Sequence, residues 1–247
     1  MKKLLLGCLI FITSCQTATA TQTPALLPSP TATLPPSPVP ATLTPAPTAT
    51  LEPAPTPFPR FFVNEFDLPF GGWSLLQSNS DIAPQATVTD GFLSVEISSP
   101  FTWIYSIHDA YDYADVRIDA QLQNRAGISS SIGLICRYSE ENGWFEFNIS
   151  TDGTYNVLYG KWLTVGITDY LPITDGSSKL IQPSSATQQI GLICSGTTLS
   201  LVVNETILRH LDVTRYELAK GKVGITVSSF ENVPVIAVFD WVKVSEP

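Results

Sequence analysis

The chain has 247 residues, with 13 basic and 22 acidic side chains and a formal net charge of −9. This balance disfavours nucleic-acid binding, which depends on clustered Lys and Arg, and it disfavours docking to anionic lipid by charge. Thirteen of the 20 prolines lie between Pro24 and Pro59. Because such a stretch cannot bury a core, the folded part of the chain must follow it.

Residues 1–14 have the features of an export signal, with two lysines before the apolar run 4–14. A membrane-spanning helix needs roughly 20 apolar residues, so this run is too short to be an ordinary span. The run ends in ITSC, which resembles the bacterial lipobox and implies lipid attachment at Cys15. We therefore expect an exported protein anchored to the cell envelope through Cys15, with its domain facing outward. The alternative is a plain secretory signal cut near Ala18 or Ala20.

Residues 15–59 form a linker rich in Thr, Pro and Ala, in which Glu52 is the only charged residue. Proline fixes φ and removes a backbone donor, so extended polyproline II is the favoured local state. We expect a disordered spacer that reaches on the order of 100 Å when fully extended. A stalk with O-linked sugars and an undecorated tether both remain open.

Residues 60–247 contain short runs in which apolar and polar side chains alternate, separated by turn residues. In the run 115–122 one face is apolar and the other is polar, which is typical of a strand with one face in water. The SEENG segment at 139–143 indicates a hairpin loop. No long 3.6-residue period occurs, and 212–219 is at most one or two helical turns. Strands are expected at 91–97, 115–122, 133–138, 144–150, 154–159, 189–194, 198–203, 222–228 and 235–244.

This pattern predicts an all-β domain of about ten to thirteen antiparallel strands, as a β-sandwich or jelly roll. A closed up-and-down barrel is the alternative.

Several motifs spread over residues 61–245 carry a family resemblance. They are NEFD at 64–67, GW at 72–73, GLICRY at 133–138, WFEFNIS at 144–150, DG at 152–153, LSLVVN at 199–204, GKVGI at 221–225 and FDWVKV at 239–244. Together they resemble the concanavalin-like jelly rolls, which include family 16 glycoside hydrolases, laminin-G-like modules and the 3-keto-disaccharide hydrolase domain. The resemblance implies a fold but no single function, because this sandwich hosts lectins, hydrolases and adhesion modules. Relatives usually have Asn-Gly where this chain has Asn204-Glu205, and since Glu disfavours positive φ we expect a wider turn.

Cys136 and Cys194 are an even pair in the mature chain, and both follow Leu-Ile. An exported protein meets oxidising conditions, so we expect a disulfide between two strands. Two buried free thiols are the alternative.

The resemblance also implies a structural Ca²⁺ site that ties the chain ends together. The matching positions are Asp240, Glu65 and Gly91, where a carboxylate and backbone carbonyls would supply hard oxygen ligands. The alternative is that Asp240 only bonds to the neighbouring strand.

Signals for catalysis are weak. Family 16 enzymes carry Glu-x-Asp-x-x-Glu or a close variant on one strand, and no such run exists here. His108 and His210 are the only histidines, no Gly-x-Ser-x-Gly elbow occurs, and no Cys-x-x-Cys pair suggests zinc. We expect a domain without catalysis that binds carbohydrate or another surface polymer. A hydrolase related to the 3-keto-disaccharide hydrolases and a structural or adhesion module are the alternatives.

Sugars are recognised by aromatic planes flanked by polar groups. Alternation places Trp103 with Tyr105 on one strand face, Tyr155 with Tyr159 on another, and Trp144 with Glu146 and Asn148 on a third. Trp144 and Trp162 are candidates for exposed rings, although core packing claims most aromatic residues. The candidate ligand-binding residues are Trp103, Tyr105, Arg137, Trp144, Glu146, Asn148, Tyr155, Tyr159 and Trp162.

Overall fold

The computed structural model describes residues 58–67, 71–182 and 186–247, all within the compact unit Ala54–Pro247. The predicted signal, the lipid-bearing Cys15 and nearly all of the linker lie outside the described residues. Within the described part of the chain, no helix has the length and apolar character that a bilayer crossing requires.

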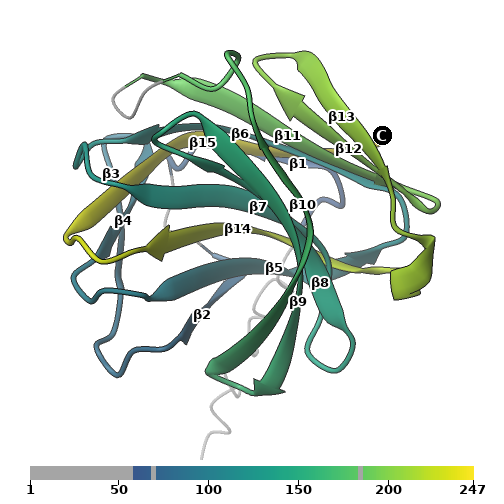
Figure 1. The fold of residues 1–247 in the computed structure, drawn as a ribbon, viewed down its shortest axis with the longest axis horizontal. Helices are drawn as coiled ribbons and strands as arrows, with labels where there is room; N and C mark the ends of the chain where they lie inside the picture. The colour runs from purple at the N-terminus through teal and green to yellow at the C-terminus, as the bar shows by residue number, and fades with distance from the viewer. Residues whose placement is uncertain (1–57, 68–70, 183–185) are drawn as a thin grey trace, which may run out of the picture. The chain divides into compact units, whose positions relative to one another are not determined.

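Fifteen strands form two antiparallel sheets packed face to face (Figure 1). The strands are β1 (Phe62–Asn64), β2 (Trp73–Ser78), β3 (Gln85–Thr89), β4 (Phe92–Ile97), β5 (Trp103–Tyr113), β6 (Val116–Asn124), β7 (Ser130–Ser139), β8 (Gly143–Ser150), β9 (Thr154–Thr164), β10 (Ile167–Ser177), β11 (Gln188–Ser195), β12 (Thr198–Val203), β13 (Thr206–Asp212), β14 (Gly221–Ser229) and β15 (Val235–Ser245). A single 3-10 turn, Thr214–Tyr216, is the helical element predicted near 212–219. The all-β antiparallel sandwich is confirmed.

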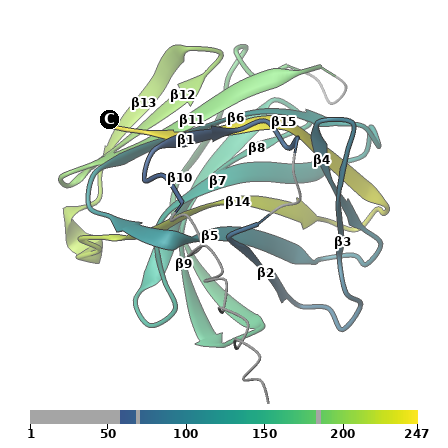
Figure 2. The same ribbon diagram turned by 180° about the vertical axis from the view of Figure 1, so that it is seen from behind.

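One sheet has the order β13-β12-β11-β6-β15-β4-β3, with β1 also paired to β15, and the other has the order β10-β9-β8-β7-β14-β5-β2. Figure 2 shows β13, β12, β11, β6 and β15 of the first sheet side by side, with β14, β5 and β2 of the second below them. Every strand pair is antiparallel, and most neighbours are distant in sequence, as a jelly roll requires.

The core lies between the two sheets and follows the alternation of the sequence. On β6 the apolar side chains of Val116 and Ile118 are fully buried in the core, whereas Arg117 and Asp119 on the other face form an ion pair of 2.7 Å. On β8 the rings of Phe145 and Phe147 lie in the core and are 0% exposed. Alternation therefore turns the intervening residues of β8 to the opposite face of its sheet.

The disulfide prediction is confirmed. Cys136 on β7 is bonded to Cys194 on β11, with Cα atoms 6.7 Å apart, so the bond joins one sheet to the other. Both residues are fully buried. The bridge closes a loop with a sequence separation of 58.

The expectation of a wide turn at Asn204-Glu205 is wrong. Val203 pairs directly with Thr206, so the loop is a two-residue hairpin in which Asn204 and Glu205 have φ of 47° and 63°. The Asn204 side chain accepts a hydrogen bond from the Gln189 amide at 3.0 Å. This anchor holds the left-handed turn although Glu205 is a poor residue for it.

β9 and β10 extend beyond the rest of their sheet. Pairing between β8 and β9 ends at Trp144 and Gly160, and from there to its tip β9 pairs only with β10. We call residues 161–170 the ribbon. Its tip reaches the opposite edge of the same sheet, where the Asn79 amide donates to the Gly166 carbonyl at 3.2 Å. In Figure 1 the two strands pass in front of the sheet toward β2.

Candidate functional site

The side of the seven-stranded sheet that faces away from the other sheet is called here the distal face. It carries a second apolar cluster, separate from the core, in which Trp144 is fully buried. The members are Tyr105, Ile107, Ile135, Tyr138, Trp144 and Trp162, with Leu76, Trp103 and Tyr170 packed against them. We call this set the aromatic cluster. As predicted, Trp144, Glu146 and Asn148 share one face of β8, and Trp103 shares a face with Tyr105.

Glu146 is the polar centre of the aromatic cluster and is 1% exposed. Its carboxylate accepts hydrogen bonds from the Trp144 indole N–H at 3.0 Å, the Asn148 amide at 2.8 Å and the Tyr170 hydroxyl at 2.9 Å. Burial raises the pKa of Glu146, and the three donors oppose that shift. None of the ion pairs among the described residues includes this carboxylate.

The rings of the aromatic cluster pack on one another. The Trp144 ring centroid lies 5.2 Å from that of Trp162 and 5.4 Å from those of Tyr105 and Tyr138. The Trp162 indole N–H donates to the Tyr138 hydroxyl at 3.0 Å. Burial raises the pKa of Tyr105 and Tyr170 well above the usual tyrosine value, with a further contribution from Glu146.

The expectation that Trp144 and Trp162 expose their rings is wrong, because the two residues are 0% and 6% exposed. The physical reason is the ribbon, which carries Trp162 and Tyr170 onto the distal face. Gly160 lets the backbone of β9 lie directly against Trp144, since a Cβ on Gly160 would stand 2.5 Å from the Trp144 ring. Trp103 is half-buried at the margin of the aromatic cluster.

Tyr155 and Tyr159 share a face of β9, as predicted, but it is the core side. The Tyr155 ring packs on Phe147, and the Tyr159 ring packs on Phe145. These two tyrosines therefore lie on the opposite side of the sheet from the aromatic cluster.

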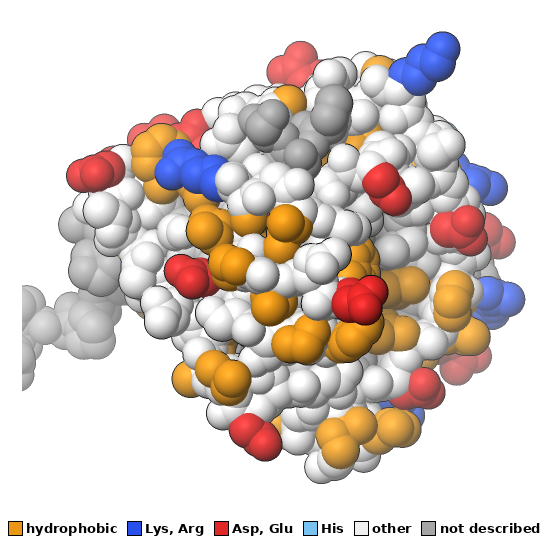
Figure 3. Space-filling view, turned by 60° about the vertical axis from the view of Figure 1, so that its left-hand side comes forward, with side chains coloured by type: hydrophobic (Ala, Val, Ile, Leu, Met, Phe, Trp, Pro, Cys, Tyr) orange, Lys and Arg blue, Asp and Glu red, His pale blue; other side chains and the backbone are white. Residues whose placement is uncertain are grey.

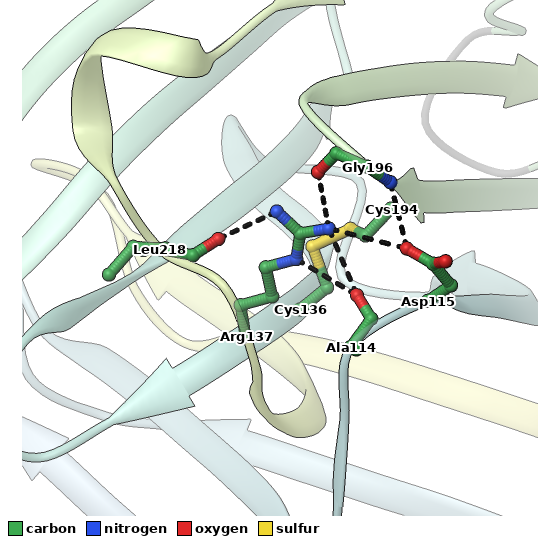
Figure 4. Close-up of polar contacts among 7 residues, drawn as sticks. All are labelled: Ala114, Asp115, Cys136, Arg137, Cys194, Gly196 and Leu218. Carbon is green, nitrogen blue, oxygen red and sulfur yellow. Dashed lines mark hydrogen bonds and ion pairs between the residues drawn. A yellow bond between two sulfur atoms is a disulfide. The ribbon is translucent and has the colours of Figure 1, made fainter.

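Arg137 also lies away from the distal face. A bulge at this point of β7 gives Arg137 a φ of 53° and turns its side chain inward, where it is 3% exposed. Its guanidinium donates to the carbonyls of Ala114 at 2.9 Å, Leu218 at 2.6 Å and Gly196 at 2.7 Å (Figure 4). Asp115 pairs with it at 3.6 Å. Through these contacts Arg137 holds three loops together beside the disulfide.

A cavity of about 540 Å³ opens at one end of the distal face, and sequence reasoning did not single it out. Tyr138 belongs both to this cavity and to the aromatic cluster. Close to it, Lys222 pairs with Asp109 at 2.7 Å. The other lining residues come from strand ends and loops, where alternation is a weak guide: Asp112, Ser139, Glu140, Glu141, Asn142, Glu217, Leu218, Ala219, Lys220 and Gly221.

The three residues predicted to hold Ca²⁺ are brought to one region. β1 and β4 pair with the same edge of β15, with Asn64 opposite Val242 and Leu93 opposite Phe239. The Glu65 carbonyl oxygen lies 3.8 Å from the point where a Cβ on Gly91 would stand. The Asp240 carboxylate accepts a hydrogen bond from Gln121.

Across the described ranges, no group of three or more His, Cys, Asp and Glu side chains is placed to hold a metal. A Ca²⁺ ion at this edge would therefore need mostly backbone carbonyls as ligands. The site stays a prediction.

The surface is dominated by neutral and acidic groups. Figure 3 shows a broken patch of hydrophobic side chains across one face, with acidic side chains around it. The ribbon contributes exposed aliphatic groups elsewhere: Leu163, Val165 and Ile167 are 70%, 59% and 52% exposed.

No family model matches the sequence, and no curated protein matches it. Solved structures do match the fold. A Bacillus licheniformis beta-glucanase is similar with a TM-score of 0.53 and 12% identity, over 76% of this chain and 98% of its own. A Bacillus subtilis protein of unknown function with a galectin-like fold gives 0.54 and 12%, over 75% and 94%.

LamA of Zobellia galactanivorans, in complex with laminaritriose and laminaritetraose, gives a TM-score of 0.51 and 10% identity, over 74% of this chain and 97% of its own. At such identities the likeness shows the fold alone. The chain is thus a concanavalin-like antiparallel β-sandwich.

Proposed function

We propose that the domain binds carbohydrate, or another extracellular polymer, at the distal face without catalysing its cleavage. The observation that carries the proposal is the row of Trp144, Glu146 and Asn148 on β8, with the rings of Tyr105 and Tyr138 beside it. Aromatic planes alternating with an amide and a carboxyl group suit the apolar faces and the hydroxyls of a pyranose. Similar folds whose names include a beta-glucanase and a laminaritriose complex support the choice of ligand class.

The absence of a second buried carboxylate beside Glu146, among the described residues, supports binding without catalysis. Hydrolysis of a glycoside usually needs two carboxyl groups, about 5–9 Å apart, on either side of the bond. Among the described buried residues, the only carboxylates are Glu146 and Asp119, and Asp119 lies on β6 of the other sheet. Glu146 is moreover bonded to three donors, and Asp109, which alternation places on the same face of β5 as Tyr105, is paired with Lys222.

The cavity beside Tyr138 is the natural entrance to this site. It is continuous with the aromatic cluster through Tyr138, and its volume of about 540 Å³ is within the range of ligand pockets. Asn142 and Lys222 in its lining supply amide and ammonium donors for hydroxyl groups.

The test is a glycan array, followed by calorimetry on the best glycan, with the full chain carrying Cys15→Ser to prevent lipidation. Glu146→Gln keeps the shape of the side chain but changes its hydrogen bonding, and we expect it to weaken binding at least tenfold. Tyr155→Phe, on the core side of β9, is the matched control and should bind as the wild type. No binding to any glycan would contradict the proposal.

One observation favours a hydrolase as the second candidate. Four carboxylates, those of Asp112, Glu140, Glu141 and Glu217, line the cavity. Incubation of the protein with each bound glycan, followed by analysis for released sugars, separates the two functions. Turnover that is lost in Glu140→Gln or Glu217→Gln would establish the hydrolase and contradict the non-catalytic proposal.

We also propose that the protein is exported and held at the cell envelope by lipid on Cys15, with residues 15–59 as a spacer. The lipobox-like ITSC sequence at 12–15 supports this location. Mass spectrometry of the protein extracted from membranes should find a diacylglyceryl group on Cys15. Recovery of the wild-type chain in the medium, cut near Ala18 or Ala20, would contradict it.

A further inference from the structure

Strand pairing joins the ribbon to the rest of its sheet at one end only. Beyond Gly160, residues 161–164 of β9 pair with β10 and with no other strand. β10 also has an irregularity in its register between Pro172 and Thr174, just beyond the ribbon. An isolated two-stranded hairpin is marginally stable in water. The ribbon therefore depends on its contacts with the distal face.

Those contacts are the packing of the Trp162 ring, whose centroid lies 5.2 Å from that of Trp144 and 5.4 Å from that of Tyr105, and a set of hydrogen bonds. The Tyr170 hydroxyl bonds to the Tyr105 hydroxyl at 2.7 Å and donates to Glu146 at 2.9 Å. Thr168 lies 3.1 Å from the same Tyr105 hydroxyl. At the tip, the Thr168 amide donates to the Ser78 hydroxyl at 3.2 Å.

The other side of the ribbon is free of packing. Leu163, Val165 and Ile167 are each more than half exposed, although the same face of β9 packs into the core at Val157. Moving the ribbon away from the distal face would therefore break no core contact on its outer side. The ribbon thus has two features that favour local opening: its β9 segment pairs with no strand other than β10, and its outer side chains are mostly exposed.

We propose that the ribbon is a displaceable plug that occupies the ligand site, and that ligand binds the distal face only when the ribbon has moved away about Gly160. This inference rests on the proposed function. With the ribbon displaced, Tyr105, Tyr138 and Trp144 present ring faces beside Glu146 and Asn148. Trp162, whose ring packs on Trp144 at 5.2 Å, holds the place that a sugar ring would take.

With a plug of this kind, the apparent affinity is the affinity of the open form multiplied by the fraction of molecules that are open. Anything that fixes the ribbon should weaken binding, and anything that loosens it should strengthen binding. A residue that merely supports the fold, or one that contacts ligand, would not produce the second effect.

The first experiment fixes the ribbon with an engineered disulfide, Ser78→Cys with Thr168→Cys. The Ser78 side chain already contacts the backbone amide of Thr168, so the two residues are neighbours at the tip. In the oxidised form we expect at least a tenfold loss of affinity for the glycan that the wild type binds best. The reduced form of the same double variant is the control and should bind at least as tightly as the wild type, because the hydroxyl contacts of Ser78 and Thr168 are lost without a covalent bond replacing them. Equal binding by the oxidised form overturns the plug.

The second experiment loosens the ribbon with Tyr170→Phe, which removes both hydroxyl contacts to the distal face. The closed form loses about one net hydrogen bond, so the fraction of open molecules should rise about fivefold. We therefore expect about fivefold tighter binding. Tyr155→Phe is the matched control, since it removes a hydroxyl from the core side of β9. Unchanged or weaker binding by Tyr170→Phe contradicts the plug.

The third measurement needs no ligand, so it separates failure of the plug from failure of the proposed function. Native-state hydrogen exchange should show the tip amides of Asn79 and Thr168 exchanging at least tenfold faster than those of Leu134 and Ile225 in the central strands. Equal rates would show that the ribbon opens only on global unfolding, and would overturn the plug. A wild type that binds no glycan but shows fast tip exchange refutes the proposed function alone.

Discussion

At the scale of single residues, Glu146 is the most informative side chain. A buried carboxylate without a cationic partner is costly, and here only hydrogen-bond donors stabilise its charge. Burial is the largest influence on Glu146 and raises its pKa above the ordinary 4.5. A group with this environment destabilises the fold when it is ionised, because its burial is not offset by a charged partner.

The prediction for Glu146 concerns pH. Because its folded pKa is raised, the stability that it contributes is fully present below about 4.5 and is lost as pH rises through the folded pKa. Glu146→Gln removes this titration. We therefore expect the wild type to lose stability relative to Glu146→Gln as pH rises from 4.5 through the raised pKa, by at most about 1.4 kcal/mol per pH unit. Urea unfolding of both proteins across this range measures it.

The matched control is Glu141→Gln, on the exposed loop between β7 and β8. A stability difference between wild type and Glu146→Gln that stays constant with pH would show that Glu146 is not the titrating group.

At the scale of elements, the hairpins show how turn chemistry and tertiary contacts compete. The β12–β13 loop places Glu205 at φ 63°, in the left-handed region that favours glycine. Contacts of Asn204 with Gln189 and Leu180 fix the loop in spite of this cost. The turn is therefore tight for a reason that lies outside its own two residues.

Glu205→Gly should relieve this strain. The left-handed conformation costs a residue with a Cβ roughly 1–2 kcal/mol, and part of that gain is offset by the greater freedom of glycine in the unfolded chain. We expect stabilisation of about 0.5–1 kcal/mol in chemical denaturation. Glu231→Gly, in a bend with no such φ, is the comparison and should not stabilise the protein.

The local pattern predicted nine of the fifteen strands in the described residues but not the ribbon. Alternation along β6 and β8 assigned Ile118 and Phe147 to one face and Glu146 to the other, as found. The strand expected at 154–159 ended before Trp162, so alternation did not assign that residue to a face of β9. The position of the ribbon depends on where β8 stops pairing with β9 and on the curvature of the sheet. Neither property can be inferred from the residues of the ribbon itself.

At the scale of the whole domain, the two sheets are held by their shared core and by one covalent bond. Cys136 and Cys194 lie on strands of different sheets, and Arg137 next to the bond ties Ala114, Gly196 and Leu218 together. The disulfide therefore joins the two sheets next to the loops that Arg137 holds together.

Replacing both cysteines, Cys136→Ala with Cys194→Ala, should destabilise the domain strongly. In the chain-entropy model a loop of 58 residues corresponds to about 4 kcal/mol, and each truncated side chain also leaves a small void in the core. Urea unfolding of the double variant, beside the wild type with and without reductant, measures this. A change under 1 kcal/mol would show that the bond is not formed in the native protein.

The crowding of rings on the distal face makes the domain its own spectroscopic reporter. Trp103, Trp144 and Trp162 are three of the five tryptophans of the chain, and all belong to one aromatic cluster. Asymmetric packing of neighbouring indoles gives near-ultraviolet circular dichroism, so most of that signal should come from this one region. Ellipticity near 290 nm would follow the state of the distal face in an unlabelled protein, while the far-ultraviolet spectrum of the strands stays constant.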